Sequence, residues 1–224
     1  MNFLITAGGT REYIDPVRFI SNASSGRMGY ALARAALAAG HKVTLITAPT
    51  AQDPPRGAKA VKVQTAAEMF DAVRKHFSRC DCLIMAAAVA DYTPVRRAPT
   101  KLKKTARNLT IKLKPTPDIL KWAGKHKSDQ VVVGFALEDK AVRVSAEKKL
   151  RQKNLDMIVA NTPAAIGTDR STVQIKTLTS AWVRIENAAK STTARKIVSL
   201  AEMLRRHEIA SCHKGRVTAV SELK

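Results

Sequence analysis

The chain has 224 residues, 45% hydrophobic but only 4% aromatic, so one domain with an aliphatic core is expected. The formal net charge of +21 indicates either a generally basic surface or an anionic partner, which could be a nucleic acid or a polyanion such as a nucleoside triphosphate. No apolar run approaches the roughly 20 residues that cross a membrane, and we expect neither a membrane segment nor a signal peptide. Three cysteines without metal-ligand spacing indicate a reducing cytoplasm and argue against a zinc site.

The first half of the chain alternates between the strand and helix patterns. The continuous apolar run 80–89 is typical of a central parallel strand that is covered on both faces. The order β-α-β-β-α-β predicts the α/β class, with a three-layer αβα, Rossmann-like architecture and a mostly parallel sheet. The elements expected here are strands at 2–7, 42–47, 60–65 and 80–89, and helices at 27–39 and 66–79.

The second half begins with a basic stretch, 91–107, that has no periodicity and is predicted to be a mobile loop. Residues 108–114 alternate apolar and polar side chains, which predicts a strand with one wet face, used as an arm. We therefore expect a single domain over 1–210, with the arm and basic loop within about 92–116, and a loose polar tail over 211–224. The other expected elements are helices at 117–126, 143–154 and 190–210, strands at 130–137 and 155–160, a loop at 162–171, and a hairpin of 172–178 with 181–186.

The stretch 15–29 is the most informative part of the sequence, because a loop of small polar residues leads directly into a helix. Such a loop directs free N–H groups and the positive end of a helix dipole at one point, which suits a phosphate. Ser24, Ser25 and Gly26 are the candidate phosphate contacts, and Asn22 adds a donor and an acceptor at the mouth of the loop. The alternative is that the glycines only permit tight helix packing.

The glycine loop also suggests a nicotinamide-dependent reductase, which the spacing disfavours. In a dinucleotide fold the loop follows the first strand directly, whereas residues 9–23 intervene here. The Tyr and Lys pair four residues apart that short-chain dehydrogenases need is missing as well, because no tyrosine of this chain is followed by a lysine at that spacing.

The run Ala86-Ala87-Ala88-Val89-Ala90-Asp91 ends the most apolar predicted strand. Ligands of open α/β sheets lie beyond the carboxyl ends of such strands, and small residues there leave room for a flat ring. Asp91 suits a ring amine, a hydroxyl or a Mg²⁺ shell, whereas the alternative is an ordinary aspartate that caps the next turn.

Two groups of lysines are candidate phosphate contacts. Lys101, Lys103 and Lys104 lie in the basic loop, which would close on a triphosphate. Lys149 and Lys153 project from one face of a predicted helix and would form a second clamp. A solvated basic surface is the alternative for both groups.

Together these residues resemble the phosphopantothenoylcysteine synthetase family, the ligases of coenzyme A biosynthesis. The block Asn-x-Ser-Ser-Gly-x-Met-Gly at 22–29 is highly specific. The matching segments span 5–161 in order: Ile5 to Glu12, Asp15 to Gly29, Ala86 to Tyr92, Lys101 to Lys104, Pro117 to Leu120, Val133 to Phe135, and Lys149 to Asn161. In many bacteria this activity is the C-terminal half of a protein whose N-terminal half is a flavin-dependent decarboxylase. The resemblance thus implies a free-standing synthetase without flavin, and a separate decarboxylase as a candidate partner.

The resemblance implies that CTP, or ATP as in the animal enzymes, activates 4′-phosphopantothenate. The carboxylate attacks the α-phosphate and releases pyrophosphate, and the amine of cysteine then expels the nucleoside monophosphate from the acyl-nucleotidylate. Such chemistry needs cations and placed N–H groups rather than a protein nucleophile. No direct protein ligand is expected for the metal. Mg²⁺ is expected on the nucleotide phosphates, with Asp91 as its only candidate protein contact.

The resemblance also implies the roles of single residues. Asn22 would hold the acyl intermediate, and Lys101 would act from a loop that closes over the nucleotide. The strand 108–114 corresponds to the family's dimerisation region, so a homodimer with the pantothenate site near its interface is expected. The implied nucleotide site consists of Ala86, Ala87, Ala88, Asp91, Pro117, Asp118, Ile119, Leu120 and Phe135, with Lys149 and Lys153 on the phosphates.

The chain departs from the family pattern in three places, and the second and third, beside the nucleotide pocket, make CTP a weaker prediction than the ligase itself. The chain reads Gly8-Gly9-Thr10-Arg11 for Gly-Pro-Thr-Arg, Pro115-Thr116-Pro117-Asp118 for Lys-Asn-Pro-Asp, and Ala136-Leu137-Glu138-Asp139 for Ala-Ala-Glu-Thr. A basic nucleic-acid-binding protein on a Rossmann-like scaffold is the remaining alternative. It ranks low because the aromatic residues that would stack bases are few and scattered.

Overall fold

The computed structural model describes residues 1–105 and 108–221, with side chains up to residue 207 outside that gap. An eight-stranded sheet has the strand order β12-β11-β10-β9-β6-β1-β4-β5. Its strands are β1 (Asn2–Ala7), β4 (Lys42–Thr47), β5 (Lys59–Lys62), β6 (Cys82–Met85), β9 (Val131–Leu137), β10 (Met157–Asn161), β11 (Arg170–Thr177) and β12 (Val183–Ala189). All neighbours from β10 to β5 pair in parallel, whereas β11 and β12 are antiparallel.

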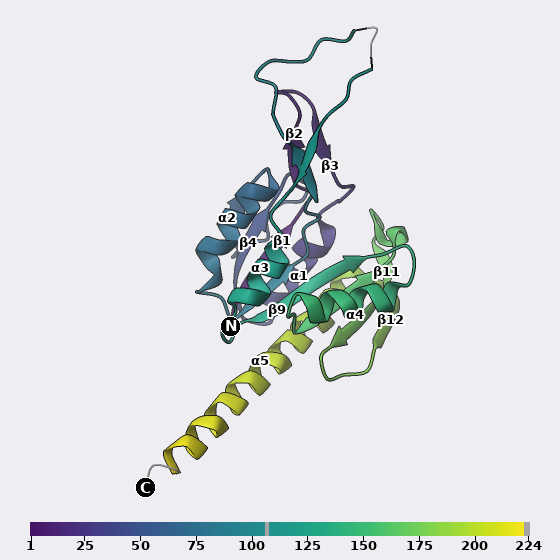
Figure 1. Cartoon of the computed structure of the whole chain (residues 1–224). Helices are drawn as coiled ribbons and strands as arrows, with labels where there is room; N and C mark the ends of the chain where they lie inside the picture. The colour runs from purple at the N-terminus through teal and green to yellow at the C-terminus, as the bar shows by residue number, and fades with distance from the viewer. Residues whose placement is uncertain (106–107, 222–224) are drawn as a thin grey trace.

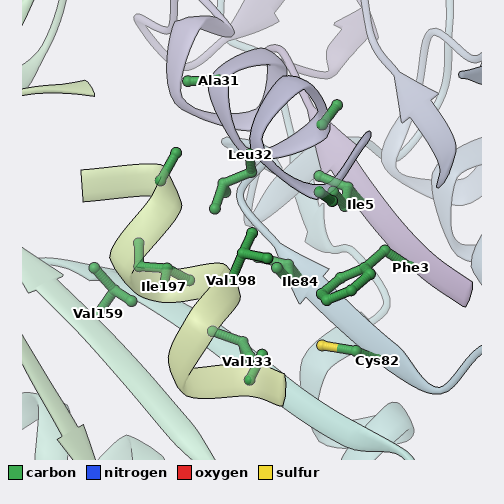
Figure 2. Packing of buried hydrophobic residues seen from close by; sticks show 14 of the residues in the cluster. Phe3, Ile5, Ala31, Leu32, Cys82, Ile84, Val133, Val159, Ile197 and Val198 are labelled. Carbon is green, nitrogen blue, oxygen red and sulfur yellow. The ribbon is translucent and has the colours of Figure 1, made fainter. Parts of the chain in front are cut away.

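In the part of the chain that the structure describes, five α-helices cover the two faces of the sheet. A short 3₁₀ helix, η1 (Pro163–Ala165), is present in addition. One face carries α1 (Arg27–Ala38) and α5 (Lys190–Ser221), which pack Leu32, Ile197 and Val198 onto strand residues such as Ile84 (Figure 2). The other face carries α2 (Ala66–Phe77), α3 (Ile119–His126) and α4 (Val142–Gln152). The predicted three-layer αβα architecture is therefore confirmed.

The central strands show why the sequence forms a sheet that is buried on both sides. All four residues of β6 are buried, and Cys80 and Cys82 belong to the clusters on opposite faces. The chain leaves β1 toward β4 on one side and reaches β6 on the other, so β1 and β6 flank the point where the strand order reverses. A ligand site is expected beyond the carboxyl ends of these two strands.

A two-part projection extends from the carboxyl edge of the sheet (Figure 1). Its first part is a hairpin of β2 (Arg11–Tyr13) and β3 (Phe19–Ser21). Its second part, here called the arm, is residues 92–116, in which β7 (Tyr92–Pro94) pairs with β8 (Leu113–Pro115). The arm and the hairpin lie side by side, since the N–H of Ala98 donates to the carbonyl of Ile14.

Three sequence predictions about elements need correction. The strand expected at 80–89 ends at Met85, because the N–H groups that follow turn toward Thr6 Oγ1 and the carbonyl of Gly8. The strand expected at 108–114 is reduced to Leu113–Pro115, where β7 offers a partner. No loose tail begins after residue 210, since α5 continues to Ser221 and an existing helix needs no further nucleation. Residues 106–107 of the basic loop and 222–224 of the tail lie outside the described residues.

No helix among the described residues has the length and apolar character that crossing a membrane requires.

Candidate active site

A cavity of about 960 Å³ lies where the sequence analysis places the ligand, at the carboxyl ends of the central strands. It contains every predicted site residue except Lys101: Asn22, Ser24, Ser25, Gly26, Ala86, Ala87, Ala88, Asp91, Pro117, Asp118, Ile119, Leu120, Phe135, Lys149 and Lys153. These residues come from five separate segments of the chain. The fold brings them together because parallel strands end at the same edge.

One wall of the cavity is the loop 22–26, which leads directly into α1. Gly29 allows α1 to lie directly on β1, because a Cβ at this position would be 2.5 Å from the Cβ of Ala7. Gly26 begins the helix with a left-handed φ of 71°, and no described side chain caps α1. The amide of Asn22 donates to the carbonyl of Val89 at 3.0 Å, which fixes it beside the end of β6.

The floor of the cavity is the segment 86–91. The backbone of this segment is hydrogen-bonded to the residues that follow β1. The N–H of Ala88 donates to the carbonyl of Gly8 at 2.8 Å, and the N–H of Ala90 donates to Thr10 Oγ1 at 2.9 Å. The hydroxyl of Thr116 donates to the carbonyl of Ala90 at 2.6 Å. A floor of alanines whose backbone is fixed in this way leaves an open, flat surface for a ring.

A second wall carries the predicted lysine pair. Lys153 Nζ is 2.8 Å from a carboxylate oxygen of Asp118, which also caps α3 by accepting from the N–H of Lys121. Burial tends to raise the pKa of Asp118, but Lys153 and the N–H of Lys121 outweigh it and hold that pKa below its usual value. Lys149 Nζ donates to the carbonyl of Phe135 at 2.8 Å. Burial and the neighbouring charge of Lys153 lower the pKa of Lys149.

A third wall was not predicted from the sequence. Arg27 donates to the carbonyl of Gly167 at 3.1 Å and to the carboxylate of Asp169 at 2.7 Å. Lys190, the first residue of α5, donates to the carbonyl of Ala165 at 3.2 Å, and its pKa is lowered by burial. Both cations line the cavity together with Ile166 and Gly167. Arg27 stands inside the predicted loop block, but Lys190 follows a strand far along the chain and has no local pattern that marks it.

Lys101 lies outside the cavity, exposed on the arm. Its neighbour Leu102 is attached to the β2–β3 hairpin: its N–H donates to Asp15 Oδ2 at 3.1 Å. The sequence placed Lys101 shortly after the strand end at Asp91. The pairing of β7 with β8 carries the intervening chain away from the sheet instead.

The chemistry of the cavity follows from its side chains. Four cations, Arg27, Lys149, Lys153 and Lys190, face three carboxylates, those of Asp91, Asp118 and Glu138. Among the described residues, no group of three or more His, Cys, Asp and Glu side chains is placed to hold a metal ion. The fold and the cavity thus define a class, a doubly wound α/β protein with a cation-rich ligand cavity at its topological switch point.

The chain belongs to the family of the DNA/pantothenate metabolism flavoprotein C-terminal domain, whose model matches residues 1–204. It is 50% identical over 165 residues to the coenzyme A biosynthesis bifunctional protein CoaBC of Bacillus subtilis, which covers 73% of this chain and 41% of the relative. The protein of the same name from Escherichia coli is 46% identical over 165 residues, which is 72% of this chain and 41% of the relative. The chain thus spans about two fifths of the length of these relatives.

Solved structures agree with this assignment. The crystal structure of the C-terminal domain of a CoaBC protein matches with a TM-score of 0.81 and 40% identity, covering 92% of this chain and 96% of that one. A Cab2 mutant matches with a TM-score of 0.77 but 18% identity, covering 95% and 88%, and it supports the fold alone. The predicted resemblance to the phosphopantothenoylcysteine synthetase family is confirmed.

Proposed function

We propose that this protein joins 4′-phosphopantothenate to cysteine, with a nucleoside triphosphate, preferably CTP, as the activating co-substrate. One observation carries the proposal: a single cavity brings the amide of Asn22, the alanine floor at 86–91 and four cations together. The placement of the predicted residues on one surface, and the high identity to CoaBC proteins over this domain, both support it.

The proposed reaction has two steps. In the first, a carboxylate oxygen of 4′-phosphopantothenate forms a bond to the α-phosphorus of the nucleotide, and the bond to pyrophosphate breaks. In the second, the amine of cysteine attacks the acyl carbon, loses a proton and expels the nucleoside monophosphate. In both steps negative charge builds up on a leaving phosphate, pyrophosphate in the first and the nucleoside monophosphate in the second. Cations and fixed N–H groups stabilise this charge without a protein nucleophile.

The cavity has parts suited to each demand of this reaction. The open surface of Ala86 to Ala88 fits a flat base, and Lys149 and Lys153 fit its phosphates. Asn22 lies in the loop before α1 and donates to the carbonyl of Val89 after β6, and in this proposal its side chain contacts the acyl group. Arg27 and Lys190 add positive charge elsewhere in the cavity lining, which suits the phosphate of the second substrate.

Mg²⁺ fits this cavity as a partner of the nucleotide rather than of the protein. Of the three carboxylates that line the cavity, Asp118 is already engaged by Lys153 and the N–H of Lys121. Asp91 and Glu138 remain, and Asp91 is the candidate contact because it follows the alanine floor on which the base would lie. When bound, Mg²⁺ would neutralise phosphate charge.

Pyrophosphate release tests the proposal directly. We expect release over many turnovers only when nucleotide, 4′-phosphopantothenate and cysteine are all present, with product mass confirming the new amide bond. Without cysteine, release should stop at about one pyrophosphate per active site, because only the first step can occur. Assays with CTP and with ATP at equal concentration decide the co-substrate, and a higher kcat/KM with CTP is expected. Release that is independent of cysteine and 4′-phosphopantothenate would contradict the ligase.

We also propose that the protein is a homodimer joined through the hairpin and the arm. Six of its exposed large apolar side chains lie on these two segments: Val17, Phe19, Tyr92, Val95, Leu109 and Leu113. Apolar groups gathered on a projecting arm favour a second copy of the same surface.

Light scattering after size exclusion tests the dimer with two matched variants. Val95 is 53% exposed on the arm and Val144 is 70% exposed on α4. We expect Val95→Asp to be monomeric and Val144→Asp to keep the mass of the dimer. A dimeric Val95→Asp would mean that the arm is not the interface.

A further inference from the structure

Asp15 is the most completely engaged carboxylate in the hairpin, and it lies outside the cavity. Its side chain is 0% exposed. Oδ1 accepts the N–H groups of Val17 and Arg18, both at 2.8 Å, and thereby shapes the turn between β2 and β3. Oδ2 accepts the N–H of Leu102 on the arm at 3.1 Å. One carboxylate therefore joins two segments that are far apart in the sequence.

Further contacts complete this attachment. Arg18 Nε is 3.4 Å from Asp15 Oδ2, and the guanidinium of Arg18 also donates to the carbonyl of Leu102. Closer to β7, the N–H of Ala98 donates to the carbonyl of Ile14 at 2.8 Å. Lys101 thus lies on a short piece of chain, residues 98–102, whose two ends are hydrogen-bonded to the hairpin.

The same hairpin leads directly into the reacting end of the cavity. β3 ends at Ser21, and Asn22 follows with its amide on the carbonyl of Val89. Asn22 and Lys101, the two residues to which the family resemblance implies a catalytic role, are therefore attached to one hairpin, although 79 positions separate them in the sequence. The position of the arm relative to the hairpin depends on the Asp15 carboxylate.

We propose that Asp15 is a positioning residue, which fixes the backbone at Leu102 and so sets where Lys101 stands for the ligase reaction. This inference rests on the proposed function through Lys101. The attachment itself does not depend on that function.

A negatively charged Asp15 is suited to fixing the backbone at Leu102. Burial would raise the pKa of the carboxyl, but the N–H groups of Val17, Arg18 and Leu102 and the charge of Arg18 outweigh burial and keep the pKa below its usual value. A charged acceptor forms stronger hydrogen bonds than a neutral one.

The variant Asp15→Asn separates the contact of Asp15 with the arm from its contacts within the hairpin turn. The amide oxygen preserves the acceptor for Val17 and Arg18, whereas the amide nitrogen faces the N–H of Leu102 donor to donor. Glu12→Gln is the matched control, because Glu12 lies in the same hairpin, is 3% exposed and accepts the N–H of Ala66 on α2 instead.

Hydrogen exchange measured on peptides that contain Leu102 tests the attachment. We expect exchange at Leu102 to accelerate on the order of tenfold in Asp15→Asn, which is the loss of one charge-assisted hydrogen bond, and to stay unchanged in Glu12→Gln. Unchanged exchange in Asp15→Asn would overturn the proposal, whatever the activity of the variant.

A double-mutant cycle with Lys101→Gln tests the positioning role. If Asp15 acts through Lys101, Asp15→Asn lowers kcat with little change in the KM for cysteine, and it lowers kcat no further once Lys101 is replaced. Additive losses would mean that Asp15 acts independently of Lys101, which contradicts positioning. Failure of the wild-type protein to release pyrophosphate would instead contradict the proposed function, and the exchange result would still decide the attachment.

Discussion

The two edges of the sheet use charge in different ways. At the amino edge, cations meet carboxylates: Arg205 is 2.7 Å from Asp129 and 3.4 Å from Asp81, and Lys127 is 2.5 Å from Asp156. At the carboxyl edge, Lys149 and Lys190 donate to backbone carbonyls, and only Arg27 and Lys153 among the lining cations contact a carboxylate.

This difference indicates that the cations at the amino edge contribute to stability and that those at the carboxyl edge contribute to function. At the amino edge the cations are paired with carboxylates and do not line the cavity, so the loss of one weakens the fold and leaves the cavity intact. A cation on a neutral carbonyl keeps its charge available, and a phosphate competes well for it. Replacements at the amino edge should therefore lower the melting temperature, and those at the carboxyl edge should lower turnover. The following variants test this rule, beginning with the largest expected effect.

Asn22→Asp should lower kcat on the order of 100-fold or more, because the amide donor is lost and a negative charge enters beside the reacting groups. The melting temperature should change little. Asn154→Asp is the control, since Asn154 also donates an amide N–H to a carbonyl, that of Gly124 at 2.8 Å, but lies outside the cavity. Accumulation of acyl-nucleotidylate in rapid-quench samples would place Asn22 in the second step, and normal turnover would remove it from the mechanism.

Lys101→Gln should lower kcat by about tenfold to 100-fold with an unchanged melting temperature, because a cation that acts only on the reacting phosphates does not hold the fold. Lys112→Gln, an exposed lysine on the other limb of the arm, should behave as wild type. Equal rates for both variants would show that the basic loop is only solvated.

Lys149→Gln should raise the KM for the nucleotide on the order of tenfold at neutral pH, with the exposed Lys148→Gln as control. The lowered pKa of Lys149 means that it loses its proton at a lower pH than an ordinary lysine does. In the wild type the KM should therefore rise on the alkaline side, starting below the pH expected for a free lysine. Steady-state assays of Lys149→Gln should show no such rise, and the same rise in this variant would assign it to another group.

Arg205→Met should leave kcat unchanged and lower the free energy of unfolding by about 1–2 kcal/mol, the low end for charged hydrogen bonds because Asp129 is largely exposed. For a chain of this size, that corresponds to a melting temperature lower by roughly 2–8 °C. Arg206→Met, at the exposed neighbouring position, is the control. A loss of turnover at constant stability would contradict the separation of the two edges.

The sequence predicted the centre of the site because the physics there is local. An apolar run that ends in small residues and Asp91 must end at the edge where other parallel strands end, so the cavity floor follows from the pattern alone. The loop before α1 was predictable for a similar reason, since Gly26 and Gly29 indicate a helix that begins close to other backbone.

The parts that were missed depend on contacts between distant segments. Each strand of the hairpin has three residues, too few for a period of two to be recognised. Lys190 reaches the cavity only because β11 and β12 extend the sheet and return the chain to the carboxyl edge. The position of Lys101 depends on the carboxylate of Asp15, which lies 86 residues earlier. This carboxylate accepts the N–H of Leu102, and no local sequence pattern identifies that contact.

Helix α5 reaches both edges of the sheet. Lys190 lies at the cavity on the carboxyl edge, and Arg205 pairs with Asp129 at the amino edge. Fifteen residue steps at a rise of 1.5 Å give about 22 Å, and the six steps between the seven residues of β9, at about 3.3 Å each, give about 20 Å. Helix and strand are therefore matched in length. Inserting one residue between these two positions would turn one end by about 100° relative to the other. Only one of the two contacts would survive, so the spacing between Lys190 and Arg205 limits how this helix can change in length.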